Sequence, residues 1–268
     1  MKQSVALSDQ GRNGLLSSAV FLLDWRHRPL LIIFLGCLSI EIALVILDLS
    51  INWYKWSETS AIRRLFNITR EDGLASLFAV LQTVAVASVL WLTWFLTRAA
   101  KAEKRNQTGW LIVALFLSYI AIDDGAMVHE RIGTAFQQNN GGISLVSYGW
   151  QYVMGPIFAL MGIIMFGFLW RQGNNAIRRD WLVIAFACMG TAILLDFFEG
   201  MENGYQVLVN MTGWRTKTIT HFAKSFEEFL EMLGMSIFLV LFLHHFGYLA
   251  GRLEIRIVGG KISVTKNK

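Results

Sequence analysis

Long apolar runs alternate with short polar stretches along most of this chain. A helix needs about 20 mainly apolar residues to cross the hydrocarbon core of a bilayer, and six runs are that long. They cover roughly residues 30–50, 74–97, 109–130, 150–170, 181–200 and 220–247. An open sheet leaves backbone groups unsatisfied in lipid, and the short alternating segments of a membrane barrel are not seen. The pattern therefore predicts six transmembrane helices, the fourth of them kinked at Pro156.

The C-terminal tail follows a different pattern. Residues 253–266 alternate apolar and polar positions around Gly259-Gly260, which is typical of a two-residue hairpin turn. Closing this turn would place Ile257 opposite Ile262. Because an isolated hairpin is marginally stable in water, we expect the tail to pack on a cytoplasmic helix end, a second copy of the chain or another membrane subunit.

Composition and charge fit this reading. Apolar residues make up 54% of the chain and charged residues only 16%, against about a quarter in soluble domains. Of the Lys and Arg residues, 16 lie in the terminal segments and in the second and fourth connections, and 7 lie in the other connections. Positive residues favour the cytoplasmic side, so topology explains the net charge of +5 and we expect no nucleic-acid partner.

The predicted fold class is an all-α integral membrane protein. We expect a six-helix transmembrane bundle with both termini cytoplasmic and a small C-terminal β-hairpin. Residues 1–250 would form a single transmembrane domain embedded in the lipid bilayer, and residues 251–268 would form the cytoplasmic hairpin tail.

Acidic residues are unusually frequent in the apolar runs. Ten of the 19 lie inside, or within a turn of, a predicted span: Glu41, Asp48, Asp123, Asp124, Glu130, Asp196, Glu199, Glu227, Glu228 and Glu231. A carboxylate in hydrocarbon costs at least a few kcal/mol, so such residues mark ion, proton or substrate sites. The basic groups in the same stretches are fewer, namely Lys224, Arg131, His129 and His221. Metal ions or protons are therefore expected to balance the remaining charge.

The topology places most of these acids at one depth. With the predicted orientation, the third and fifth helices run outward and the sixth runs inward. At 1.5 Å per residue, Asp123, Asp196 and Glu231 all come about 20 Å from the inner ends of their helices. We therefore expect one site in the outer half of the bilayer.

The candidate ligands combine many oxygens with imidazole and no thiolate, which suits iron, manganese or zinc. Di-iron and di-manganese proteins hold their metals with carboxylate and His residues on facing helices, although their Glu-x-x-His spacing is missing at this depth. The predicted metal ligands are Asp123, Asp124, His129, Glu130, Asp196, Glu199, His221, Glu227, Glu228 and Glu231. Lys224 would tune the charge of the site. His244 and His245 lie near the inner end and are excluded.

Two strings of residues resemble motifs of uncharacterised bacterial multi-pass membrane proteins. Residues 122–133 contain an acidic pair followed by His-Glu, and residues 226–234 contain Glu-Glu-x-x-Glu-x-x-Gly. The resemblance implies the bacterial cytoplasmic membrane as location and supplies no established activity.

The sequence favours a His/carboxylate metal site, in a metal-dependent membrane enzyme of di-iron-like or zinc type. Two other functions stay open: a proton or cation transporter or channel that uses the acid cluster, and an accessory subunit of a larger membrane complex. Transport ranks lower, because few polar residues could continue a path to the inner face: Gln82, Thr83, Ser118 and Tyr119. The substrate and the reaction do not follow from the sequence.

Overall fold

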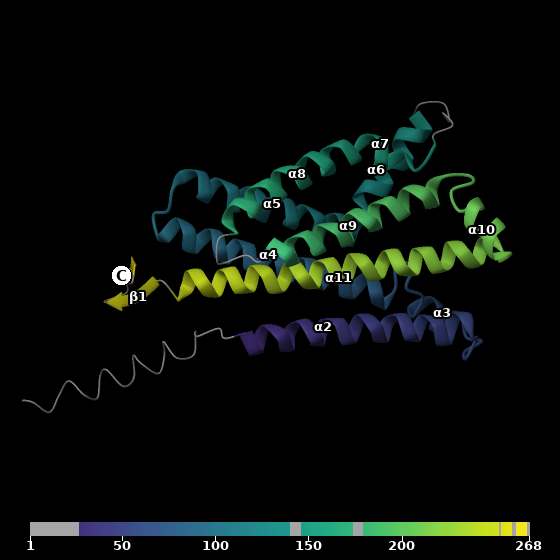
Figure 1. Cartoon of the computed structure of the whole chain (residues 1–268), viewed down its shortest axis with the longest axis horizontal. Helices are drawn as coiled ribbons and strands as arrows, with labels where there is room; N and C mark the ends of the chain where they lie inside the picture. Colours follow the sequence, from purple (N-terminus) through teal and green to yellow (C-terminus); the bar gives the residue numbers. More distant parts are fainter. Residues whose placement is uncertain (1–26, 140–145, 174–178, 252, 259–260, 267–268) are drawn as a thin grey trace, which may run out of the picture.

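The structure, a computed structural model, describes residues 27–139, 146–173, 179–251, 253–258 and 261–266 (Figure 1). Its helices are α2 (His27–Asp48), the π-helical turn η1 (Leu49–Trp53), α3 (Ser60–Leu65), α4 (Leu74–Ala99), α5 (Lys104–Ala126), α6 (Val128–Asn139), α7 (Gly149–Val153), α8 (Gly155–Gln172), α9 (Arg179–Gly200), α10 (Gln206–Thr212) and α11 (Thr216–Ala250). The strands are β1 (Leu253–Val258) and β2 (Lys261–Lys266).

Six stretches of the described chain are helical, long and apolar enough to cross a membrane. They are Pro29–Trp53, Leu74–Ala99, Lys104–Ala126, Gly155–Gln172, Arg179–Gly200 and Thr216–Ala250. Each corresponds to one of the six apolar runs in the sequence. They indicate a multi-pass membrane protein.

The predicted fold class needs correction. The described residues form ten α-helices rather than six, because the connections at one end of the bundle fold into α3, α6, α7 and α10. The packed fold is all-helical, and the expected hairpin is not an element of it. Strands β1 and β2 pair antiparallel, with Ile255 opposite Val264, but they lie beyond the end of α11 and outside the bundle (Figure 1). Two strands alone bury too little surface to add a layer to a fold.

Parts of two predictions lie outside the described residues, namely the hairpin turn at Gly259-Gly260 and the N-terminal segment before residue 27. The cytoplasmic side of the termini stays a prediction, and so does the organisation into a single transmembrane domain with a hairpin tail.

Two predicted spans are also shorter at their site-facing ends. The third ends at Ala126 instead of residue 130, because Met127 takes a left-handed conformation with φ of 51° that a continuing α-helix cannot accept. The fourth begins at Gly155 instead of residue 150, and Pro156 lies in the first turn of α8 rather than at a kink. Proline fits there because the first turn of a helix has no internal partner for the missing N–H.

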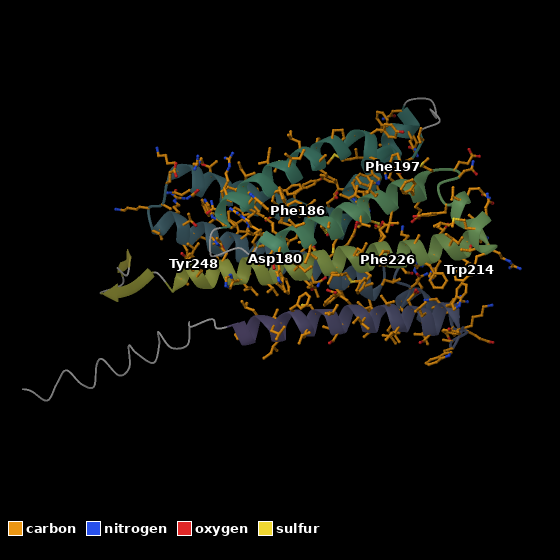
Figure 2. All side chains as sticks on the ribbon, viewed as in Figure 1. Asp180, Phe186, Phe197, Trp214, Phe226 and Tyr248 are labelled. Carbon is orange, nitrogen blue, oxygen red and sulfur yellow. The ribbon has the colours of Figure 1, made fainter. Side chains whose placement is uncertain are left out.

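Helix α11 forms the axis of the bundle and packs against α9, α4 and α2. Small residues allow this close packing: a Cβ added at Gly234 would lie 2.8 Å from Met189 Sδ on α9. Helices α9 and α11 run in opposite directions, so Asp180 lies near Tyr248 at one end and Phe197 lies toward the end that holds Trp214 (Figure 2). We call the end with α3, α6, α7 and α10 the site end, and the end near β1 the tail end.

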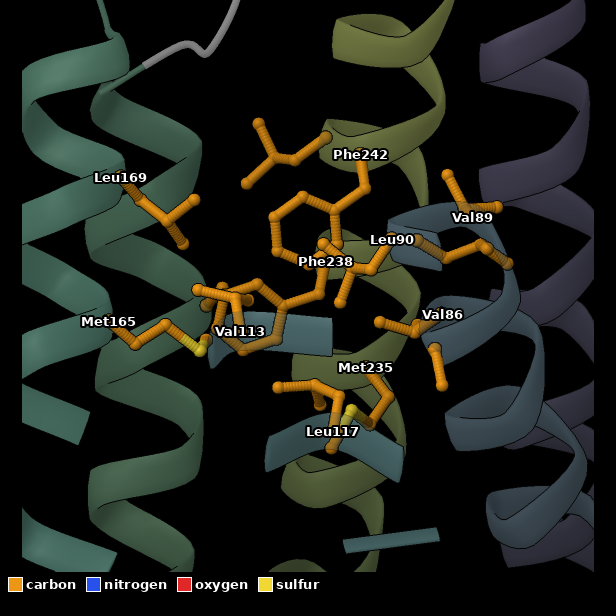
Figure 3. Packing of buried hydrophobic residues seen from close by; sticks show 14 of the residues in the cluster. Val86, Val89, Leu90, Val113, Leu117, Met165, Leu169, Met235, Phe238 and Phe242 are labelled. Carbon is orange, nitrogen blue, oxygen red and sulfur yellow. The ribbon is translucent and has the colours of Figure 1, made fainter. Parts of the chain in front are cut away.

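A continuous apolar core fills the bundle on the tail-end side. It contains Val86, Leu90, Val113, Leu117, Met165, Leu169, Met235, Phe238 and Phe242 (Figure 3). The rings of Phe238 and Phe242 are stacked with centroids 5.7 Å apart. Trp110 and His245 extend this tail-end core, with their rings 4.5 Å apart and both side chains buried. His245 therefore lies away from the acids, as the sequence predicts.

Candidate functional site

A cavity of about 970 Å³ lies on the site-end side of this core. We call it the site cavity. Its walls come from α4, α5, α6, α7, α8, α9 and α11. Eight carboxyl groups line it: Glu71, Asp123, Asp124, Glu130, Asp196, Glu227, Glu228 and Glu231. Its basic lining residues are Lys224 and His129. The cavity is therefore strongly acidic as well as large.

The break between α5 and α6 builds one side of the cavity. Because the chain turns at Met127, His129 folds back onto Asp123 in the last turn of α5. The backbone N–H of His129 donates to Asp123 Oδ1 at 2.8 Å, and its ring Nδ1 lies 2.8 Å from Asp123 Oδ2. A continuous helix over residues 109–130 would have separated these two side chains along its axis.

The partners of His129 decide its charge. Burial lowers the pKa of His129, but the hydrogen bond with Asp123 and the negative charge of that residue outweigh burial and raise the pKa above its ordinary value. Its ring also lies edge-on to Trp150, with centroids 5.0 Å apart. The contacts with Asp123 and Trp150 thus fix the position of the His129 imidazole at the cavity wall.

Glu71 enters the site from the connection between α3 and α4, outside the predicted spans. Burial, and next the hydrogen bond with Glu130, raise the pKa of Glu71 to about 7. Two acids that approach each other in a poorly solvated place share a proton more readily than they both ionise. The sequence does not reveal Glu71 as a site residue, because nothing in its polar connection indicates that it is buried.

Neutral side chains on α7 and just before it hold the acids of α9. Gln151 Nε2 donates to Asp196 Oδ2 at 2.7 Å, and Tyr148 Oη donates to Glu199 Oε1 at 3.2 Å. Burial and the nearby charge of Glu199 raise the pKa of the Tyr148 hydroxyl, which therefore remains a donor. The sequence does not reveal the roles of Tyr148, just before the predicted fourth span, and Gln151, at its start, because neither side chain carries a charge.

Lys224 is the ammonium group in the cavity wall, and its partner is on another helix. Its Nζ lies 3.6 Å from Glu199 Oε1 on α9. Glu199 is therefore already paired with a cation and with Tyr148, and it lies behind the surface of the cavity. On α4, the hydroxyl group of Thr83 donates a hydrogen bond to Asp124 Oδ2 at 3.3 Å.

Helix α11 contributes the acids that have fewest partners. Glu227, Glu228 and Glu231 all line the cavity. Glu227 is only 6% exposed, and its Oε2 has no hydrogen-bond partner among the described residues. A buried carboxylate oxygen without a donor is costly, so this atom points to a proton or a cation that the neighbouring side chains do not supply.

Three residues that the sequence suggested for the site lie away from the site cavity, namely His221, Asp48 and Glu41. His221 does not line the site cavity in the described chain; its Nε2 lies 3.0 Å from Asp48 Oδ2, between α11 and the end of α2. Glu41 is fully buried between α2, α4 and α11, where it accepts hydrogen bonds from Gln82 at 3.0 Å and Ser236 at 2.6 Å. These groups link helices, and they leave His129 as the imidazole of the site.

The structure thus brings together eight of the ten predicted ligands, namely Asp123, Asp124, His129, Glu130, Asp196, Glu227, Glu228 and Glu231. Their donor atoms suit a hard or borderline metal ion. Their placement does not yet form a ligand set: within the described residues, no three His, Cys, Asp or Glu side chains are close enough to hold one metal ion. The chemistry of the donors fits a metal, whereas their spacing in this conformation does not.

Comparison with known families gives a match over most of the chain. Residues 17–246 match the family described as Domain of unknown function (DUF8692). No curated protein and no solved structure matches the chain. The match confirms the resemblance to uncharacterised proteins with no established activity.

Proposed function

For this chain, which belongs to the family of the Domain of unknown function (DUF8692), we propose that the site cavity binds a divalent metal ion between its carboxylates. Iron, manganese and zinc are the candidates, and the protein would be a metal-dependent enzyme of the bacterial cytoplasmic membrane. The observation that carries the proposal is the unpartnered Oε2 of Glu227, which is buried in a cavity with eight carboxyl groups.

Charge balance supports a bound cation. Lys224 and His129 are the basic lining residues, and each is already paired, with Glu199 and Asp123 respectively. Lys224 lies close enough to attract Glu227 and Glu228 as well, but its ion pair is with Glu199. A divalent ion would neutralise two of these carboxylates and would contact Glu227 Oε2. Without a counter-ion, the burial of each carboxylate away from water is unfavourable.

The candidate ligands are Glu227, Glu228 and Glu231 on α11, with Asp124 and His129 opposite them. Glu228 and Glu231 are three residues apart and share a face of the helix. Because the described conformation holds no ready ligand set, binding requires new rotamers of these side chains. No reaction step is assigned to the metal.

The experiment measures metal in protein purified without chelator, by mass spectrometry, and then titrates chelator-treated protein with Zn²⁺, Mn²⁺ and Fe²⁺. We expect about one ion or more per chain. Glu228→Gln should weaken binding by about tenfold or more, as loss of groups around metal sites commonly does. The matched control is Glu103→Gln, a neutralisation of an acid that is 64% exposed at the tail end.

Equal metal content in Glu228→Gln and Glu103→Gln would contradict the proposal, as would wild-type protein that binds none of the three ions. Melting curves of both variants separate loss of the ligand from loss of the fold.

The other two functions have less support. A transporter needs a polar path through the bundle, and the tail-end core places Phe238, Phe242 and Leu169 across that path. Assembly with a second copy or with other membrane subunits, including a role as accessory subunit, stays a prediction that no contact among the described residues tests.

A further inference from the structure

The site cavity is acidic at one end and apolar at the other. Its apolar lining includes Phe116, Phe158, Met165, Phe186, Met189 and Phe238. Met165 and Phe238 also belong to the tail-end core, so the cavity reaches down to that core. It therefore offers both a polar and an apolar environment to one ligand.

The helix register gives the distance between the two ends. On α9, Phe186 and Asp196 are ten residues apart, and on α11, Glu228 and Phe238 are also ten apart. Ten residues of α-helix span about 15 Å. Two helices thus separate the acidic end from the apolar end by the same distance, which matches an extended alkyl chain of dodecyl length.

Glycines leave open space along this length. Gly155 and Gly162 on α8 and Gly190 on α9 all line the cavity. A Cβ added at any of the three would meet no atom within 4 Å. Because ligand cavities commonly measure about 300–1,000 Å³, the volume of about 970 Å³ is ample for a single-chain molecule.

Helix α8 lines one side of this space and is lightly packed on the bundle. The residues of α8 that are buried are Met165 and Leu169, while Leu160 and Ile163 on its other side are 59% and 71% exposed. A lipid-soluble ligand can therefore come from the bilayer by displacing a single, lightly packed helix.

Charge selects the head group. Even with one proton shared between Glu71 and Glu130, a divalent ion, Lys224 and a charged His129 supply only four positive charges to the other seven carboxyl groups of the cavity. An anionic head would be repelled by the carboxylates that remain, and a neutral head would leave them without a counter-ion. An ammonium group supplies a further positive charge and donates charge-assisted hydrogen bonds to carboxylate oxygens such as those of Glu227.

We propose that the site cavity binds a single-chain aliphatic amine from the bilayer, with its ammonium group at Glu227 and its chain directed toward Phe238. The inference rests on the proposed function for the identity of the site and deepens it by naming the class of ligand that shares the cavity.

The experiment uses the full chain in nanodiscs and isotope-labelled dodecylamine as the probe. We expect saturable binding that dodecanoate and butylamine do not displace, because the first has the wrong charge and the second lacks the chain. Dodecanol should compete only weakly. Glu227→Gln should weaken binding by about tenfold, the usual size of a lost charged contact.

Two glycine variants form the matched pair. Gly162→Leu fills the cavity, and Gly167→Leu adds the same side chain to an exposed position of α8 where a Cβ also meets nothing within 4 Å. Each displaced methylene changes affinity by roughly threefold to fourfold, so Gly162→Leu should lose most binding and Gly167→Leu should keep it. Gly190→Leu repeats the test from α9 if Gly162→Leu does not fold.

Equal binding by Gly162→Leu (or its replacement) and Gly167→Leu would overturn the inference, and so would displacement by dodecanoate as strong as by unlabelled dodecylamine. Metal content of the same samples keeps the two proposals apart. Metal without amine binding overturns only this inference, whereas amine binding without metal overturns only the proposed function.

Discussion

Individual carboxyl groups around the site cavity differ mainly in what lies next to them. Asp123 accepts a hydrogen bond from the backbone N–H of His129 and lies against its ring, so it has an imidazole partner. Glu71 instead lies beside a second acid, Glu130, and its pKa is raised to about 7. One carboxyl group of the site thus positions an imidazole, whereas another holds a proton.

The raised pKa of Glu71 predicts that the stability of the folded protein depends on pH. The pKa of Glu71 rises from 4.5 unfolded to about 7 in the folded chain, so the folded state binds the proton more tightly. The resulting stabilisation is present below pH 4.5 and is lost as the pH rises to about 7. Gln at this position stays neutral, so Glu71→Gln should gain stability relative to the wild type over this range.

Melting temperatures of chelator-treated wild type and Glu71→Gln, measured from pH 4.5 to pH 8, test this expectation. Glu58→Gln, at an exposed position in the same connection, is the control. Parallel pH curves for wild type and Glu71→Gln would show that Glu71 does not hold its proton more tightly in the fold.

At the scale of elements, the site depends on how the short helices at the site end touch one another. Helices α6 and α7 approach with their backbones in contact: a Cβ at Gly133 would lie 2.4 Å from the backbone N of Trp150. This contact holds α7 in place, and α7 in turn carries Trp150 against His129 and Gln151 against Asp196.

Gly133→Ala should therefore lower the free energy of unfolding by about 1–3 kcal/mol, because overpacking forces the two backbones apart. Gly167→Ala on α8 is the matched control: its Cβ meets nothing within 4 Å, and alanine favours a helix over glycine by about 1 kcal/mol. Denaturation in detergent compares the two. Equal stability of the variants would contradict the backbone contact between α6 and α7.

At the scale of the whole molecule, the bundle has two unlike halves. The site-end half encloses an acidic cavity, and the tail-end half is filled by the core around Phe238 and Phe242. In membrane proteins, ion pathways are lined by polar groups or water. The described chain therefore has a chamber that is closed toward the tail end.

Protein reconstituted in liposomes should consequently give no proton or metal-ion flux above that of empty liposomes under an imposed gradient. A pH-sensitive or metal-sensitive dye inside the vesicles measures it. Flux that Glu231→Gln abolishes would instead establish the acid cluster as part of a transport path and would favour that function over the closed chamber.

Sequence alone determined the six apolar runs and the common depth of the main acids. Both follow from local quantities, namely hydropathy over about 20 residues and the rise of 1.5 Å per residue. The depth argument correctly grouped Asp123, Asp196 and Glu231, which all line the site cavity. It also excluded His245, which is buried beside Trp110.

Only the tertiary structure decided which side chains face each other. Depth does not fix the direction in which a residue points around its helix axis, so His221, at a suitable depth, pairs with Asp48 instead of lining the cavity. The turn at Met127 and the burial of Glu71 depend on contacts between segments far apart in sequence. Rotation about the axis and contact between distant segments are set by packing, and packing is not a property of any single run of residues.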